Sequence, residues 1–205
     1  MDNTTKNETI LSMYSELVTG FKNIAPLEPW EEKLICELFH PAHLNKNDFF
    51  LKEGQVNNHL AFMKTGLVRY FVYKKEEEST LEFTSEGEFI GEYQSFTTRK
   101  KSIQSIQALE DCELLTISYE NLQRFFNDTT HGNLIGRLVI EHRFNTMIDQ
   151  LLSIYMKTPK ERYQYFLDHY YHLTQRIPQY LIASYIGVKP ASLSRIRRQM
   201  AKHIS

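Results

Sequence analysis

The C-terminal part of the chain carries basic and hydroxyl side chains at helical spacing, a combination that can bind nucleic acid. Arg195 can place its guanidinium on the O6/N7 edge of a guanine, a contact that contributes roughly 1–3 kcal/mol of base discrimination. The other basic side chains suit phosphates, which give salt-dependent affinity without sequence information, and the serines can donate to phosphates or base edges. The candidate set is Lys189, Ser192, Ser194, Arg195, Arg197 and Arg198.

The segment around these residues has the pattern of a helix-turn-helix. Ala183 supplies a small residue where two helices would touch, and Gly187 ends the first helix at a position where a positive φ suits glycine. Val188 follows as an apolar pin, and Pro190 suits the first turn of a second helix. Two apolar residues at a spacing of three would then face the core: Leu193 and Ile196. The alternative is an ordinary helical hairpin with a solvated cationic face.

A long helix is predicted upstream, over residues 132–157, because this stretch contains no proline. Five apolar side chains form a heptad seam typical of helix pairing: Ile140, Phe144, Met147, Leu151 and Ile154. A second apolar stripe lies on the adjacent face: Leu134, Leu138, Ile148, Leu152 and Tyr155. We expect one of these faces to cover the β domain and the other to meet a partner helix, which gives a homodimer with the seam as its candidate interface. The alternative is a helix buried wholly inside one subunit.

The centre of the chain alternates between short apolar runs and turn residues. Strand-like runs occur at residues 48–51, 59–64, 67–73, 80–84, 103–108 and 113–117. Short strands at this spacing predict an all-β sandwich or barrel rather than βαβ units. Helical periodicity precedes them over residues 9–39, and Ser118 is placed to cap a short helix after them. A further helix is predicted from Thr158-Pro159 to about His172. The fold class is therefore α+β.

Composition and charge bound the possible functions. The chain has 205 residues, 41% of them hydrophobic, with 24 basic and 25 acidic side chains. The charge is unevenly distributed along the chain. Residues 157–205 hold nine basic and two acidic side chains, whereas the rest of the chain has a formal net charge of −8. Two cysteines exclude a disulfide framework and a four-thiolate iron–sulfur cluster. No apolar run reaches the roughly 18 residues of a membrane span, and a signal-peptide pattern is missing, so we expect a cytoplasmic protein without a membrane partner.

Taken together, these features resemble the bacterial Crp/Fnr (cyclic-AMP receptor protein/fumarate–nitrate regulator) family of transcription factors. The resemblance covers most of the chain. It rests on Phe89-Ile-Gly-Glu92, residues 108–118, the long helix, and the motif Ser192-Leu-Ser-Arg-Ile196.

This resemblance implies three domains and a dimeric DNA-binding protein. The domains would be an N-terminal β-roll (jelly roll) of the cyclic-nucleotide-binding type, a dimerisation helix and a helix-turn-helix domain, over residues 1–127, 128–157 and 158–205. The implied homodimer binds a palindromic promoter site in double-stranded DNA, with half-sites about 34 Å apart. It would recruit or block RNA polymerase.

An effector pocket in the β-roll is also implied by the resemblance. In nucleotide-binding members a Gly-Glu pair holds the ribose, and Gly91-Glu92 matches that pair. A later Arg-Ser or Arg-Thr pair holds the cyclic phosphate, and only Lys101-Ser102 can be aligned with it, by moving a gap. Since lysine lacks the bidentate fork of arginine, cyclic AMP is disfavoured. The effector is then another small ligand or none, and we expect no cofactor.

Two alternatives from other functional classes remain open. The chain could be a small-molecule sensor that signals through protein contacts and keeps a degenerate DNA-binding tail. It could also be a cupin-like jelly-roll enzyme, which needs a His/Glu metal set on its strands, but only His59 lies in the strand region. His40 and His43 are expected in a loop that enters the β domain, without a metal. The sequence contains no nucleophile–base motif, so we expect no enzyme activity.

Overall fold

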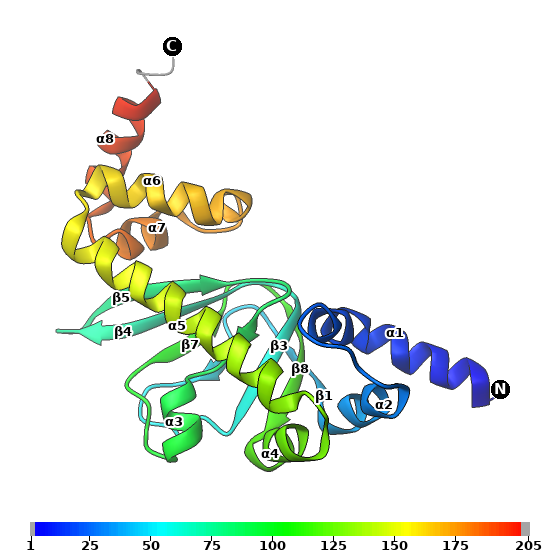
Figure 1. Ribbon diagram of the computed structural model, residues 1–205. Coiled ribbons are helices and arrows are strands. Elements are labelled where there is room, and N and C mark those ends of the chain that lie inside the picture. Colours follow the sequence, from blue (N-terminus) through cyan, green and yellow to red (C-terminus); the bar gives the residue numbers. More distant parts are fainter. Residues whose placement is uncertain (1–2, 202–205) are drawn as a thin grey trace. The chain divides into compact units, whose positions relative to one another are not determined.

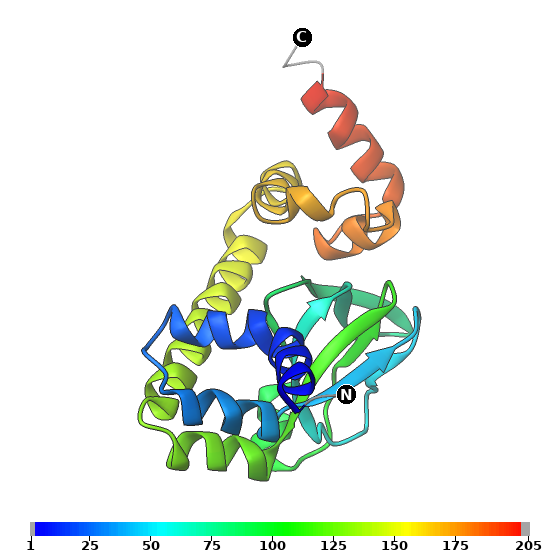
Figure 2. The ribbon, with the colours of Figure 1, turned by 90° about the vertical axis from the view of Figure 1, so that its right-hand side faces the viewer.

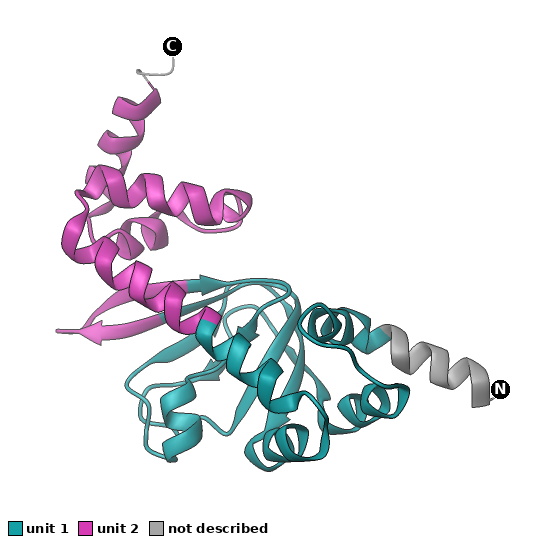
Figure 3. Cartoon of the chain, in the orientation of Figure 1, with its two compact units in different colours: residues 1–70, 83–141 teal, residues 71–82, 142–205 magenta. Residues whose placement is uncertain are grey.

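The computed structural model describes residues 3–201, with side chains from Met13 onward, and places a β-roll between two groups of helices in the sequence (Figure 1). The chain forms two compact units, residues 1–70 with 83–141 and residues 71–82 with 142–205 (Figure 3). In chain order the elements are α1 (Asn3–Lys22), α2 (Pro29–Leu38), β1 (His40–Leu44), β2 (Phe49–Leu51), β3 (His59–Thr65), β4 (Val68–Lys74), β5 (Glu77–Thr84), β6 (Phe89–Ile90), α3 (Tyr93–Thr98), β7 (Ser105–Ala108), β8 (Cys112–Ser118), α4 (Tyr119–Asp128), α5 (Gly132–Met156), α6 (Pro159–Tyr170), the 3-10 turn η1 (Tyr171–Leu173), α7 (Gln179–Tyr185) and α8 (Pro190–Ala201).

Two sheets make up the roll. Within the described chain their strand orders are β1-β8-β3-β6 and β2-β7-β4-β5. Strand β8 pairs antiparallel with both β1 and β3, so that Thr116 lies opposite His40 on one side and Ala61 on the other. The predicted β domain and the α+β class are therefore confirmed.

Strand β1 corrects one prediction, because His40 and His43 lie in a strand and not in a loop. Pro41 made this segment look irregular, since proline cannot donate to a sheet. Strand β1 is the edge strand of its sheet, so one of its sides has no neighbouring strand and a proline is tolerated there. Strand β6 and helix α3 were not expected either, because they are only two and six residues long.

Two apolar clusters stabilise the roll. One lies between the sheets and includes Met63, Val68 and Ile106, each completely buried. The other joins one sheet to the helices and contains a ring stack, in which Phe21 lies 5.1 Å from Phe125 and 6.0 Å from Phe89. Burying one such side chain contributes about 1.5–3 kcal/mol, so these clusters supply the rigidity on which a binding site depends.

Residues 71–82, from the β4–β5 hairpin, belong to the same compact unit as the C-terminal helices. Glu82 accepts two hydrogen bonds from the Arg143 guanidinium of α5, at 2.5 and 2.9 Å. The Ser184 hydroxyl of α7 accepts from the Thr80 backbone N–H at 2.9 Å and donates to the Glu78 carbonyl oxygen at 3.1 Å. The hairpin is thus tied by polar contacts to the long helix and to the helix-turn-helix.

Gly66, in the turn between β3 and β4, is expected to be indispensable for stability. Its φ is +109°, and a Cβ there would lie 2.6 Å from Cys112 Sγ and 2.8 Å from the Asp111 carbonyl oxygen. We expect Gly66→Ala to lower the free energy of unfolding by about 2–4 kcal/mol through backbone strain and overpacking. Urea unfolding measures the loss. The control is Gly20→Ala, in a helix where nothing lies within 4 Å of the new methyl group, and it should be neutral or stabilising.

Candidate nucleic-acid interface and effector site

The C-terminal helices α7 and α8 form the predicted helix-turn-helix (Figure 2, orange and red). Gly187 has a φ of +70° in the turn, as expected from its position. Val188 donates its backbone N–H to the Ala183 carbonyl oxygen at 2.9 Å, which closes the turn over the buried alanine. Leu193 is also buried, so α8 packs its apolar side on α7 and leaves the opposite side exposed.

The exposed side of α8 and its turn carries three of the candidate DNA-binding cations. Lys189, Arg195 and Arg198 are exposed, and none of them forms an ion pair with the side chains of residues 13–201. Cations held at the surface without an acidic partner leave their full charge for phosphates or base edges. Ser192 is half-buried beside them.

The other two candidates have partners inside the chain. The Arg197 guanidinium donates to the Gln179 side chain, which links α8 to the start of α7. The Ser194 hydroxyl donates to the Pro190 carbonyl oxygen at 3.2 Å, one turn earlier in its own helix. The structure thus separates an outward cationic face from residues that also support the helix pair.

Helix α6 supports this unit through one arginine and two aromatic side chains. Arg162 donates to the Ile186 carbonyl oxygen and to the Lys157 carbonyl oxygen, both at 2.8 Å, and so ties the end of α7 to the start of α6. Phe166 and Tyr170 lie against the ring of Tyr185, at centroid distances of 5.6 and 5.7 Å. Burial is the main cause that raises the pKa of the Tyr185 phenol, which therefore stays protonated.

The predicted dimer seam on α5 is exposed along its whole length. Ile140, Phe144, Met147, Leu151 and Ile154 are 37, 60, 57, 49 and 59% exposed. The second stripe covers the rest of the subunit only at the start of the helix: Leu134 packs against the core, whereas Ile148, Leu152 and Tyr155 are exposed. On this half of α5 the polar side chain of Arg143 is partly buried against Glu82. A wide apolar surface on α5 is therefore left uncovered by the described residues of the single chain.

The predicted ribose pair has structural partners in the roll. Gly91 has a φ of +141°, and its N–H donates to the Tyr70 hydroxyl at 2.9 Å. The Glu92 carboxylate accepts from the N–H groups of Gln94 and Ser95, at 3.0 and 2.9 Å, and thereby caps helix α3. This cap was not predicted, although an acidic residue just before a helix is a signal for one.

The predicted phosphate pair is split by the structure. Lys101 is exposed, while Ser102 is buried and its hydroxyl accepts from the Gln104 N–H at 2.9 Å. The Ser102 backbone pairs with Gln55, since its N–H donates to the Gln55 carbonyl oxygen at 2.8 Å. The Ser102 hydroxyl and backbone N–H are thus both engaged within the chain, whereas the Lys101 side chain is exposed.

The structure was also compared with the requirements of a metal site and of a membrane-spanning helix. Among residues 3–201, no three His, Cys, Asp or Glu side chains are grouped so that they could hold a metal ion. Within the described chain, no helix has the length and hydropathy needed to cross a membrane.

Comparison with known proteins places this architecture. Residues 41–129 match the model of the cyclic nucleotide-binding domain, whereas no curated protein sequence matches the chain. The fold is similar to that of a cyclic nucleotide-binding domain containing protein from Listeria monocytogenes, with a TM-score of 0.69 and 17% identity over 92% of this chain and 91% of that one. FixK2 from Bradyrhizobium japonicum has a TM-score of 0.69 and 14% identity, over 80% of this chain and 85% of its own.

A third similar structure carries the family name in its description. It is a transcriptional regulator of the Crp/Fnr family from Eubacterium rectale, with a TM-score of 0.64 and 19% identity over 86% of this chain and 85% of that one. Three solved structures thus share the arrangement of a β-roll followed by a long helix and C-terminal helices.

Proposed function

We propose that this chain, which contains a cyclic nucleotide-binding domain and has the fold of the Crp/Fnr transcriptional regulators, is a homodimeric, sequence-specific DNA-binding transcriptional regulator. The observation that carries the proposal is the exposed face of α8, where Lys189, Arg195 and Arg198 have no acidic partner in the described chain. The protein acts in the cytoplasm on double-stranded DNA and has no enzymatic role.

The apolar surface of α5 supports the homodimer. If two copies pair about a C2 axis along their long helices, the seam of one copy would be buried against the same seam of the other. The two helix-turn-helix units could then bind one duplex. Two units related in this way read a palindrome, with half-sites about 34 Å apart. Contact with RNA polymerase then decides whether transcription rises or falls at the promoter.

The charge distribution supports the same assignment. The C-terminal 49 residues have a formal net charge of +7, and the rest of the chain has a formal net charge of −8. DNA would therefore attract the reading helices and repel the acidic body, which orients the protein on the duplex. Such binding falls steeply with salt, because each phosphate contact releases counterions.

Selection from a pool of random duplexes, followed by Arg195→Ala, tests the proposal. We expect one enriched palindrome, and we expect the substitution to weaken binding to it about 30-fold or more, because each of two half-sites loses a contact worth at least about 1 kcal/mol. Fluorescence anisotropy measures the affinity. The control is Arg124→Ala, an exposed arginine of α4 paired with Asp128, which should leave the affinity unchanged.

Failure to enrich a palindrome, or equal losses in the two variants, would contradict the proposal. The second candidate function, a small-molecule sensor that signals through protein contacts, would then gain support. The presence of a cyclic nucleotide-binding domain favours that alternative. It predicts ligand binding by a protein that has no affinity for DNA in either state.

A further inference from the structure

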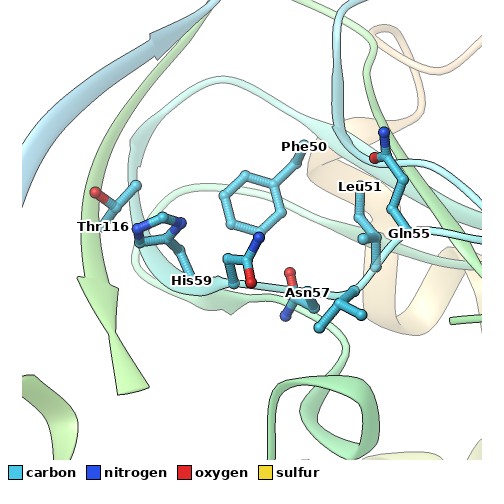
Figure 4. A pocket seen from close by; sticks show the side chains of 8 residues that line it. Phe50, Leu51, Gln55, Asn57, His59 and Thr116 are labelled. Atoms are coloured by element: carbon cyan, nitrogen blue, oxygen red, sulfur yellow. The ribbon is translucent and has the colours of Figure 1, made fainter. Parts of the chain in front are cut away.

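A cavity of about 420 Å³ opens between the two sheets of the roll, at the end where β2 leads into β3 (Figure 4). Its volume falls in the range of small-molecule sites, about 300–1,000 Å³. The lining comes from β2, the following loop, and strands β3 and β8: Phe50, Leu51, Gln55, Val56, Asn57, Asn58, His59 and Thr116.

The lining has an apolar floor and a polar rim. Leu51 and Asn57 are buried, Phe50 is half-buried, and Asn58 and His59 are exposed. The lining contains amide, imidazole and hydroxyl groups, and it contains no lysine, arginine, aspartate or glutamate. One half of each lining amide is already bonded within the chain: the side-chain oxygens of Gln55 and Asn58 accept hydrogen bonds, and the Asn57 amino group donates one. The amino groups of Gln55 and Asn58 and the side-chain oxygen of Asn57 are left to match the edge of a heterocycle, and an aromatic ring can stack on its face. The lining itself supplies no lysine or arginine for a phosphate, and the Arg99 guanidinium beside it is already bonded to the Asn58 side-chain oxygen.

The cavity wall is bonded to helix α3, the element that follows Gly91-Glu92. The Asn57 N–H donates to the Ser95 hydroxyl at 2.9 Å, and its side-chain amide donates to the Glu92 carbonyl oxygen at 3.3 Å. Arg99, at the end of α3, donates to the Asn58 side-chain oxygen at 2.7 Å. A ligand that shifts Asn57 or Asn58 would therefore also change the hydrogen bonds that join them to α3.

We propose that this cavity, rather than the internally bonded Gly91-Glu92 pair, binds an uncharged nucleoside or a similar hydroxylated heterocycle, and that α3 transmits its presence. The base would stack on Phe50 and pair with the amides, while the sugar hydroxyls would face His59 and Thr116 at the rim. The regulatory part of this proposal rests on the proposed function, whereas binding itself does not.

Calorimetry on the full chain tests the proposal, with adenosine, guanosine, cytidine and uridine as uncharged probes and cyclic AMP as the charged one. We expect saturable binding of at least one nucleoside and binding of cyclic AMP that is at least about tenfold weaker. His59→Ala, on the exposed rim, should weaken the nucleoside about tenfold, and Val56→Phe should block it by filling the cavity. The matched control is His43→Ala, an exposed histidine of β1 outside the lining, which should bind normally.

Three results would overturn the proposal: no nucleoside binds, cyclic AMP binds more tightly than all four, or His59→Ala and Val56→Phe both bind like the unaltered chain. Circular dichroism checks that the variants are folded, and His59→Ala keeps the test decisive if Val56→Phe does not fold. Anisotropy with the selected duplex, measured separately, shows whether DNA binding fails independently of ligand binding. A ligand that binds without changing DNA affinity would refute the role of α3 alone.

Discussion

The substitution Met147→Glu is expected to convert the proposed dimer to a monomer and to lower the affinity for its palindromic site by at least about a hundredfold. Met147 lies in the middle of the exposed seam on α5 and is 57% exposed in the single chain. Two symmetry-related glutamates would face each other there, and each buried apolar side chain of a seam normally contributes about 1.5–3 kcal/mol. In a dimer, binding of the first helix-turn-helix holds the second one close to its half-site, which raises the overall affinity by a factor of about 10²–10⁴. A monomer would lose this gain in affinity.

Light scattering after size exclusion measures the mass, and anisotropy measures the affinity. The matched control is Asn145→Glu, which adds the same charge two residues away at an exposed polar position of α5. It should remain dimeric and bind DNA nearly as well as the original chain. If Met147→Glu remains a dimer, the seam does not form the interface, and the helix must be covered in another way.

Breaking the ion pair between Glu82 and Arg143 is expected to produce the largest loss of stability from a single charge. The two oxygens of Glu82 accept from Arg143 at 2.5 and 2.9 Å, and the Glu82 side chain is only 9% exposed. Arg143→Met leaves this carboxylate buried without its cation, so we expect the free energy of unfolding to fall by about 3 kcal/mol. That value is at the low end for buried pairs, because Arg143 is itself 25% exposed.

Two further variants separate the loss of the pair from the loss of a long side chain. Arg137→Met, on the same helix, removes an exposed pair with Glu141 and should cost no more than about 0.5 kcal/mol. The double variant Glu82→Leu/Arg143→Met removes both charges and should regain most of the stability. Urea unfolding at matched protein concentration compares them, and equal losses for Arg143→Met and Arg137→Met would contradict the argument.

Local signals in the sequence were enough to place most elements. Ser118 caps α4 by accepting from the Asn121 N–H, and Thr158 and Glu161 cap α6 with the proline between them in its first turn. Gly187 adopts its left-handed conformation between α7 and α8. These features act over a few residues, so they can be recognised without knowing what packs where.

Contacts between distant residues could not be predicted in this way. Glu82 and Arg143 are separated by 61 residues, and neither carries a pattern that points to the other. The sequence suggested Glu92 as a ribose ligand, whereas its carboxylate caps α3, because the existence of that short helix was not foreseen. The cavity beside His59 likewise depends on how three strands meet, which periodicity along the chain does not encode.

The contact between α7 and the hairpin has a consequence for self-association. Strand β5 ends its sheet, so its outer backbone groups could serve as a template for a strand from another molecule. The Ser184 hydroxyl occupies one donor and one acceptor of that template, the N–H of Thr80 and the carbonyl of Glu78. Any movement that draws α7 away would uncover this template for as long as the movement lasts. If the proposed regulation moves α7, we therefore expect it to raise the tendency of the hairpin to self-associate.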